Sequence, residues 1–209
     1  MSILDTVRGI LDLGGPVISV LLVMSVLALG VILYKVWQFS ASGVGRHRAL
    51  SEALAAWDSG DHAMAMASLS KSSSYLAPLL DLAMNAPDVP GLDGRLDAEA
   101  GVALAGLERG FRFLDTVAQL APLLGLFGTV LGMIEAFQSL QAAGSSVDPS
   151  LLAGGIWVAL LTTAAGLAVA MPTSMFLAWF ESRTAQERVF ADKALQTVLV
   201  PNQAARNNA

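Results

Sequence analysis

Three long stretches of this chain carry no charged side chain. They are 22 residues from Leu13 to Tyr34, 19 from Thr116 to Ile134 and 32 from Pro149 to Phe180. A transmembrane helix needs about 20 mostly apolar residues to cross a hydrocarbon core of about 30 Å, and all three stretches meet that length. A soluble protein could bury one such helix, but three in a chain of 209 residues indicate a membrane protein.

The composition excludes several other classes of protein. Charged residues make up 14% of the chain, against about 25% in soluble domains, and the mean hydropathy is +0.61. The chain has no cysteine and only two histidines, so we expect no disulfide framework, no metal site and no cofactor. A formal net charge of −5 argues against a nucleic-acid partner. The uncharged stretches also lack the nucleophile–base pair that an intramembrane enzyme would need, so we expect no enzymatic activity.

Lysine and arginine are distributed unevenly around these stretches. Only Arg8 precedes the first stretch, none lies between the second and third, and the other eleven follow the first or the third. Loops on the cytoplasmic side of a membrane carry an excess of Lys and Arg. The pattern therefore predicts an external N-terminus and a cytoplasmic C-terminus. The first stretch is too long for a signal-peptide core, and we interpret it as a retained signal-anchor.

We therefore expect an all-α membrane protein with three transmembrane helices and long cytoplasmic helical extensions. The predicted segments are a periplasmic N-terminus (1–12), transmembrane helix 1 (13–37), a cytoplasmic helical segment (38–115), transmembrane helix 2 (116–135), a periplasmic loop (136–150), transmembrane helix 3 (151–180) and a cytoplasmic C-terminal helix and tail (181–209). Apolar spacing within 38–115 predicts short helices, one of them capped by Asp61. A helix starting near Leu96 is expected to continue unbroken into transmembrane helix 2, and transmembrane helix 3 to continue into the tail.

Small residues recur on one side of the second and third predicted transmembrane helices. Offsets of 0, 4, 7, 8 and 11 residues fall within one helical sector of roughly 100°. In the second helix these positions hold Ala121, Gly125, Gly128, Thr129 and Gly132; in the third they hold Gly155, Ala159, Thr162, Thr163 and Gly166, with Ala170 continuing the stripe. Small residues let membrane helices approach closely, so we expect the glycines and alanines to serve helix packing.

The threonines in these stripes allow a second interpretation. Thr129 and Thr163 each lie about 18 Å from one end of their helix, at ~1.5 Å per residue, which places both in the middle of the bilayer. A threonine hydroxyl in a membrane helix can simply bond back to its own helix. Alternatively, Thr129 and Thr163, with the neighbouring Thr162, line a polar route for an ion or a proton. Because no Asp, Glu, Lys, Arg or His lies within the three stretches, another chain would have to supply the titrating group.

The residues around the stripes resemble the MotA/TolQ/ExbB proton channel family. Residues 121–134, which read APLLGLFGTVLGMI, resemble its second transmembrane segment, and residues 154–172, which read GGIWVALLTTAAGLAVAMP, resemble its third. The preceding LERGFRFLD at 107–115 is similar to the cytoplasmic lead-in helix of the family. Length and layout are most similar to the ExbB/TolQ branch, since the flagellar MotA type has four transmembrane helices.

The resemblance implies a multi-pass subunit of a proton channel in the bacterial inner membrane, assembled as a homopentamer around a central pore. Two helices of a single-pass partner of the ExbD/TolR type would occupy the pore and carry the proton-binding aspartate. A TonB-like protein is implied as a further partner. Proton flow would be coupled to work on the cell envelope, such as TonB-type energised biopolymer transport. In the family, the threonines that match Thr129 and Thr163 line the pore and face that aspartate.

One position departs from the family pattern. ExbB-type sequences commonly have a glutamate where this chain has Val158. The departure puts in doubt any proton route through that position. It also keeps an alternative open, in which the chain is a non-conducting scaffold that holds a partner helix in the lipid bilayer.

Overall fold

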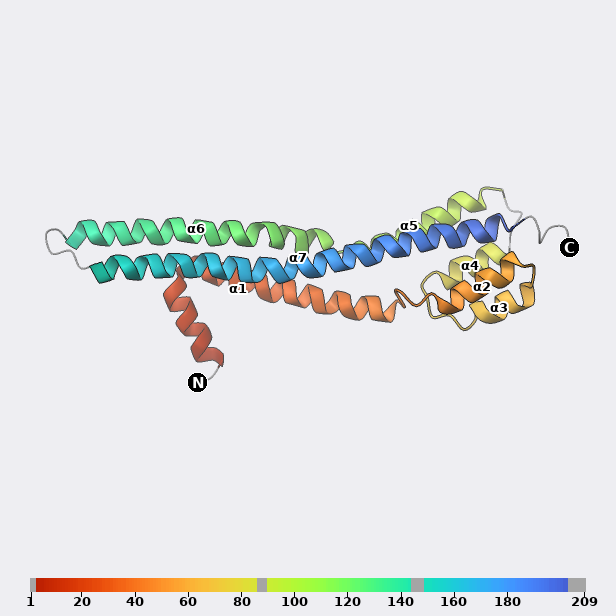
Figure 1. Ribbon diagram of the computed structural model, residues 1–209, viewed down its shortest axis with the longest axis horizontal. Helices are drawn as coiled ribbons and strands as arrows, with labels where there is room; N and C mark the ends of the chain where they lie inside the picture. Colours follow the sequence, from red (N-terminus) through yellow and green to blue (C-terminus); the bar gives the residue numbers. More distant parts are fainter. Residues whose placement is uncertain (1–2, 86–89, 144–148, 203–209) are drawn as a thin grey trace. The chain divides into compact units, whose positions relative to one another are not determined.

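The computed structural model of the chain describes residues 3–85, 90–143 and 149–202 (Figure 1). The helices in these ranges are α1 (Ile3–Ala41), α2 (Arg48–Asp58), α3 (His62–Leu69), α4 (Ala77–Asn85), α5 (Leu92–Glu108), α6 (Phe111–Ala143) and α7 (Pro149–Leu199). Within this described part the regular structure is entirely helical, which confirms the expected all-α class.

Three helical stretches are long and apolar enough to cross a membrane. They are Gly15–Ala41, Leu92–Ala142 and Leu152–Leu199, and they overlap the three uncharged stretches of the sequence. The segment predicted as an N-terminus at 1–12 is helical from Ile3, and α1 changes direction at Gly15, where φ is 60° and ψ is −160° (Figure 1). Of the loop predicted at 136–150, residues 144–148 lie outside the described residues, and α6 extends through Ala143.

The chain divides into two compact units. The membrane unit comprises residues 1–33 and 110–178, and the bundle unit comprises residues 34–109 and 179–209. Helix α7 contributes to both, because it runs for 51 residues from Pro149 to Leu199. The expectation that transmembrane helix 3 continues into the tail as one helix is therefore confirmed.

The expectation of one unbroken helix from Leu96 into the second membrane stretch is wrong. Arg109 leaves the helical conformation with a ψ of 125°, and Gly110 has a φ of 95°, so α5 and α6 are separate helices. A glycine adopts this left-handed conformation at little steric cost, whereas a residue with a Cβ does not. Gly101 and Gly106 stay helical inside α5, so the break is specific to Gly110.

The core of the bundle unit is built from the apolar faces of its short helices and the C-terminal part of α7. Its fully buried members include Leu50 of α2, Leu80 of α4 and Leu195 of α7. The indole Nε1 of Trp57 donates to the carbonyl of Val198 at 3.2 Å and so joins α2 to the end of α7. The predicted cap is confirmed, because the carboxylate of Asp61 accepts from the first turn of α3 at 2.9 Å.

Candidate functional site

The small residues of α6 and α7 face one another in the membrane unit. These two helices run antiparallel and side by side (Figure 1). Along them Gly155 lies against Ala136, Gly132 against Ala159, and Gly166 against Ala121. Each step of about four residues up α6 is matched by a similar step down α7. The two stripes read from the sequence therefore meet in a single interface.

Larger side chains would clash across this interface at four glycines, among them Gly155, where an added Cβ would clash with the Cβ of Ala136. A Cβ added at Gly166 would lie 2.5 Å from the carbonyl oxygen of Ala121, and one at Gly125 would lie 2.9 Å from that of Thr162. A Cβ at Gly128 would lie 2.6 Å from the Thr162 hydroxyl oxygen. A Cβ at Gly154, which lies on α7 with Gly166, would meet nothing within 4 Å. Close approach is therefore confined to the glycines of the stripe, as expected for membrane helices packed through small residues.

Thr162 and Thr163 reach from α7 to one carbonyl oxygen on α6. Their Oγ1 atoms lie 3.2 and 3.3 Å from the oxygen of Gly125. Thr162 is 2% exposed, and its hydroxyl also lies 2.7 Å from the carbonyl oxygen of Ala159 on its own helix. Since a hydroxyl has one proton and two lone pairs, both threonines keep acceptor capacity after these bonds are made.

Thr129 makes a different bond. Its hydroxyl donates to the carbonyl oxygen of Leu126, one turn earlier on α6, at 2.6 Å. No hydrogen bond joins it to Thr162 or Thr163 within the residues that the structure describes. Two of the three predicted threonines, Thr162 and Thr163, thus share one carbonyl acceptor across the helix interface. Thr129 instead donates its hydroxyl proton within its own helix and stays partly exposed.

The chemistry available at this interface is limited to hydrogen bonding. The sequence between Asp115 and Glu135, and between Asp148 and Glu181, contains no ionisable side chain. The threonine oxygens can accept a hydrogen bond from water or from a protonated acid, but they do not titrate near neutral pH. The helix pair therefore offers polar oxygens but no titrating group, and any group that binds and releases a proton here would have to come from outside these stretches.

Helix α1 covers one side of the pair, and much of the remaining surface is apolar and open. Val17 and Leu21 of α1 pack with Ala121 and Ala170. Several large side chains on the open surface are more than half exposed: Leu123 is 59%, Phe127 is 54%, Trp157 is 66% and Leu160 is 61% exposed. Exposed apolar surface on this scale needs a cover of lipid or of other helices.

The bundle unit contains a buried polar cluster that the sequence did not indicate. Glu187 is 1% exposed, and its Oε1 accepts from the backbone N–H of Gly45 at 2.6 Å and lies 3.0 Å from Nε2 of His47. The Tyr75 hydroxyl and Glu187 Oε2 are buried without a hydrogen-bond partner among the described residues. Burial, and after it the nearby Glu187 carboxylate, raise the pKa of Tyr75. These contacts join residues 142 positions apart, which no local pattern could have revealed.

Lys35 is a second charged residue of the bundle unit that is buried. The sequence places it as the first cation after an uncharged stretch, where a solvated side chain would be usual. In the structure it is 1% exposed, and its ammonium group donates to the carbonyl of Leu107 and to the side chain of Gln38, both at 2.8 Å. It therefore joins α1 to the end of α5.

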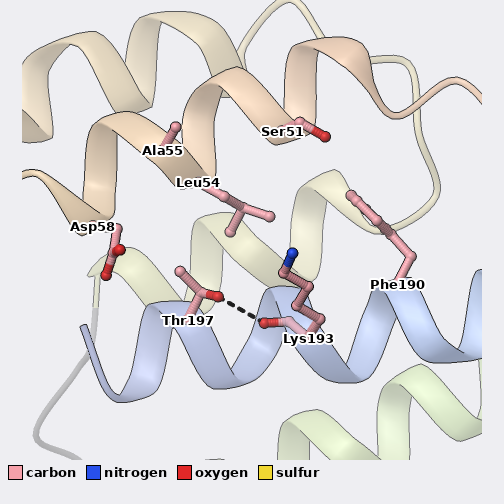
Figure 2. A pocket seen from close by; sticks show the side chains of 7 residues that line it. All are labelled: Ser51, Leu54, Ala55, Asp58, Phe190, Lys193 and Thr197. Atoms are coloured by element: carbon pink, nitrogen blue, oxygen red, sulfur yellow. Dashed lines mark hydrogen bonds between the residues drawn. The ribbon is translucent and has the colours of Figure 1, made fainter. Parts of the chain in front are cut away.

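A pocket of about 250 Å³ lies between α2 and α7 in the bundle unit (Figure 2). Two of its polar side chains are engaged: Thr197 donates to the carbonyl of Lys193 at 2.9 Å, and Asp58 accepts from the backbone of Asn202 at 2.7 Å. The residues that line it form no nucleophile–base pair. In the described ranges, no three His, Cys, Asp or Glu side chains come together as metal ligands. The pocket thus offers no catalytic arrangement.

Comparison with known proteins assigns a family. A family model for the "MotA/TolQ/ExbB proton channel family" matches residues 57–192. The biopolymer transport protein exbB1 of Vibrio cholerae is 51% identical over 63 residues, which are 30% of this chain and 28% of that protein. A protein of Synechocystis named ExbB-like 1 is 34% identical over 168 residues, which are 76% of this chain and 64% of that protein. The Tol-Pal system protein TolQ of Haemophilus influenzae is 43% identical over 72 residues, or 34% of this chain and 31% of that protein.

The matched segments thus span less than two thirds of the length of each of these relatives. The family model covers more of this chain than the exbB1 and TolQ matches do, because residues 57–192 include the whole of α6 and both small-residue stripes. The family is one of transport channels rather than enzymes, in agreement with the expectation from the sequence. With three apolar helices long enough to span a bilayer, this chain is a membrane protein that belongs to the MotA/TolQ/ExbB proton channel family.

Proposed function

We propose that this chain is an inner-membrane motor subunit that conducts protons only together with a single-pass partner of the ExbD/TolR type. The observation that carries the proposal is the α6/α7 interface, which holds Thr162 and Thr163 against the Gly125 carbonyl in stretches without any ionisable side chain. The partner supplies the aspartate that binds and releases the proton. Thr129, Thr162 and Thr163 supply hydroxyl oxygens along its route.

The proposed orientation places the N-terminus in the periplasm and the C-terminus in the cytoplasm of a bacterial cell. It is supported by the distribution of Lys and Arg, since eleven of the 12 follow the first or the third uncharged stretch and only Arg8 precedes the first. In this orientation most of the bundle unit lies in the cytoplasm.

The proposed assembly is a homopentamer around two partner helices. The open apolar surface of α6 and α7 supports assembly with other helices, because Leu123, Phe127 and Trp157 are more than half exposed in the part of the chain that the structure describes. Family membership supports the pentameric arrangement. Lipid covers the part of this surface that faces away from neighbouring subunits.

The work done by the complex is proposed to act on the cell envelope, as in TonB-type energised transport with a TonB-like protein as further partner. A membrane potential supplies ~2.3 kcal/mol per charge for each 100 mV. One proton therefore contributes a few kcal/mol, which is comparable to a modest conformational bias. Mechanical work on an outer-membrane partner then requires several protons in each cycle.

A second candidate function is that of a non-conducting scaffold for a partner helix. The observation that favours it is Val158, which stands next to the interface residue Ala159 where ExbB-type sequences commonly have a glutamate. A valine can pack but cannot take up a proton. Proton flux separates the two candidates.

The test is proton flux into liposomes that contain the purified chain with or without its co-expressed single-pass partner. The chain alone is expected to conduct no more than empty liposomes, and the complex is expected to conduct. Rapid flux through the chain alone would refute the proposed division of roles. An assembled complex that conducts no protons would favour the scaffold.

The threonine route is tested with the double variant Thr129→Val/Thr163→Val, which is expected to lower flux at least about tenfold while the complex still assembles. The control is Thr116→Val/Thr197→Val, which removes two threonine hydroxyls outside the interface; each donates to a carbonyl of its own helix, at 2.8 and 2.9 Å, as the Thr129 hydroxyl does. Equal flux in the two double variants would contradict the route.

A further inference from the structure

A basic pocket opens in the bundle unit where the segment after α1 meets the turn between α3 and α4. The pocket has a volume of about 330 Å³, and its polar lining comes from Arg46, His47, Arg48, Lys71, Ser72 and Ser73. None of the residues that line it is acidic. From this arrangement we infer that the pocket binds a phosphate group, and thus that the chain has an anion site separate from the α6/α7 interface.

The two walls of the pocket are held together by a glycine turn. Gly43 and Gly45 have φ values of 67° and 81°, which turn the chain sharply after α1. A Cβ at Gly43 would lie 3.1 Å from the carbonyl oxygen of Ser73, so the two segments are in direct contact. This contact places Arg46 on one wall and Lys71 on the other, although they are distant in sequence.

The positive charge of the pocket is largely unneutralised. Arg48 forms an exposed pair with Glu52 at 3.2 Å, whereas Arg46 and Lys71 have no salt bridge to any residue that the structure describes. The Arg183 guanidinium adds another cation nearby, since its Nη1 would lie 3.5 Å from a Cβ on Gly45. The nearest buried carboxylate, Glu187, is already engaged by the Gly45 N–H and by His47.

Uncharged donors add to these cations. Helix α2 begins at Arg48, and the side chain of His47 at its N-cap makes no hydrogen bond to the first turn, so the amides at this end keep their donor capacity and their positive dipole. The Ser72 oxygen accepts from the Ser74 N–H at 3.2 Å, which leaves the Ser72 hydroxyl proton available.

A phosphate suits this set of donors better than a smaller anion. Arginine binds phosphate oxygens through paired N–H groups, and lysine binds them as a point charge. The volume exceeds that of a single ion and leaves room for an organic substituent. The group could belong to a phospholipid headgroup or to a soluble phosphate. Arg46 follows the end of α1 at Ala41 by five residues, at most about 18 Å of chain, which brings a headgroup within reach in the proposed membrane orientation.

The test uses the full-length protein in detergent and measures binding of two probes, dihexanoyl phosphatidylglycerol and inorganic phosphate. The variant Arg46→Gln/Lys71→Gln is expected to raise the dissociation constant about tenfold or more, because it removes two charge-assisted contacts. The control Arg95→Gln/Lys193→Gln removes the same charges from exposed positions elsewhere in the bundle unit and is expected to change it less than about twofold.

Binding of the lipid without inorganic phosphate identifies a headgroup site, and binding of both probes identifies a general phosphate site. Absence of binding of either probe, or equal weakening in the two double variants, overturns the inference. A second measurement needs no variant: phosphatidylglycerol or phosphate is expected to slow phenylglyoxal modification of Arg46 but not of Arg95, read by peptide mass spectrometry. Equal rates at both arginines overturn the inference. Neither measurement depends on proton flux, so failure here leaves the proposed motor function untouched.

Discussion

Side chains fill the core of the bundle unit, whereas backbone atoms make the closest contacts between α6 and α7 in the membrane unit. Leu50, Leu80 and Leu195 are each at most 1% exposed at the centre of the bundle unit. In the membrane unit the corresponding positions are glycines, and the carbonyl of Ala121 lies directly over Gly166. The same chain therefore uses large residues for one kind of packing and the smallest residue for the other.

The difference follows from the solvent around each unit. In water, burying a leucine side chain is favourable by about 2 kcal/mol, so large apolar residues stabilise a core. Between helices in lipid this driving force is absent, and close van der Waals contact with interhelical hydrogen bonds replaces it. Substitutions should therefore have opposite consequences in the two units: removing volume damages the bundle unit, and adding volume damages the α6/α7 interface.

The largest effect is expected from Leu80→Ala. Leu80 is fully buried, so the variant loses its transfer energy and leaves a cavity, which together reduce the free energy of unfolding of the bundle unit by about 3 kcal/mol. Hydrogen–deuterium exchange should show faster exchange in α2, α3 and α4. The control is Val102→Ala, since Val102 is 74% exposed and its loss should change stability by less than about 0.5 kcal/mol. Similar exchange in the two variants would contradict this account of the core.

The next largest effect is expected from Gly166→Ala. The added methyl would meet the backbone of Ala121, which cannot move aside as a flexible side chain can, so the α6/α7 interface should lose about 2 kcal/mol. Faster hydrogen exchange in residues 121–132 and 155–166 checks this. Gly154→Ala is the matched control, because open space surrounds Gly154 and alanine there should stabilise the helix by up to about 1 kcal/mol. If Gly166→Ala were equally harmless, close backbone approach would not be what limits this interface.

The smallest effect concerns pH and the Tyr75 hydroxyl. The raised pKa of Tyr75 means that the folded state favours the neutral phenol. Its contribution to the free energy of unfolding is therefore complete below the pKa of tyrosine in the unfolded chain, about 10, and is lost as the pH rises above that value. Wild-type protein should therefore lose more stability between pH 9 and about 11 than the Tyr75→Phe variant, as measured by urea unfolding of the bundle unit. Parallel curves would show that Tyr75 does not titrate in a buried setting.

Much of the architecture was predictable because it depends on local patterns. Runs without charge predicted the three apolar helices, and the recurrence of small residues predicted which faces of α6 and α7 carry glycine and alanine. Asp61 was predictable as a cap because a carboxylate before a helical segment satisfies free backbone donors. These features need only residues close together in sequence.

The remaining features depend on contacts between distant residues. Gly101, Gly106 and Gly110 look equivalent in the sequence, yet only Gly110 interrupts the helix. Lys35 looks like a surface cation, but it is buried against the carbonyl of Leu107, 72 residues away. The sequence favoured Thr129 over Thr162 as a residue of the polar route. In the structure Thr162 is the more deeply buried of the two and bonds across the interface. Which partner such residues meet is decided by the tertiary arrangement.

The near-regular repeat of small residues has a consequence for how α6 and α7 align. If α7 slid along α6 by one turn, about 5.4 Å, Gly132 would face Gly155 and Gly128 would face Ala159, so small would still oppose small. Shape alone therefore discriminates poorly between neighbouring alignments. The observed alignment is the one that sets the hydroxyls of Thr162 and Thr163 on the carbonyl of Gly125. Interhelical hydrogen bonds, which shape alone does not require, thus mark the register that this helix pair adopts.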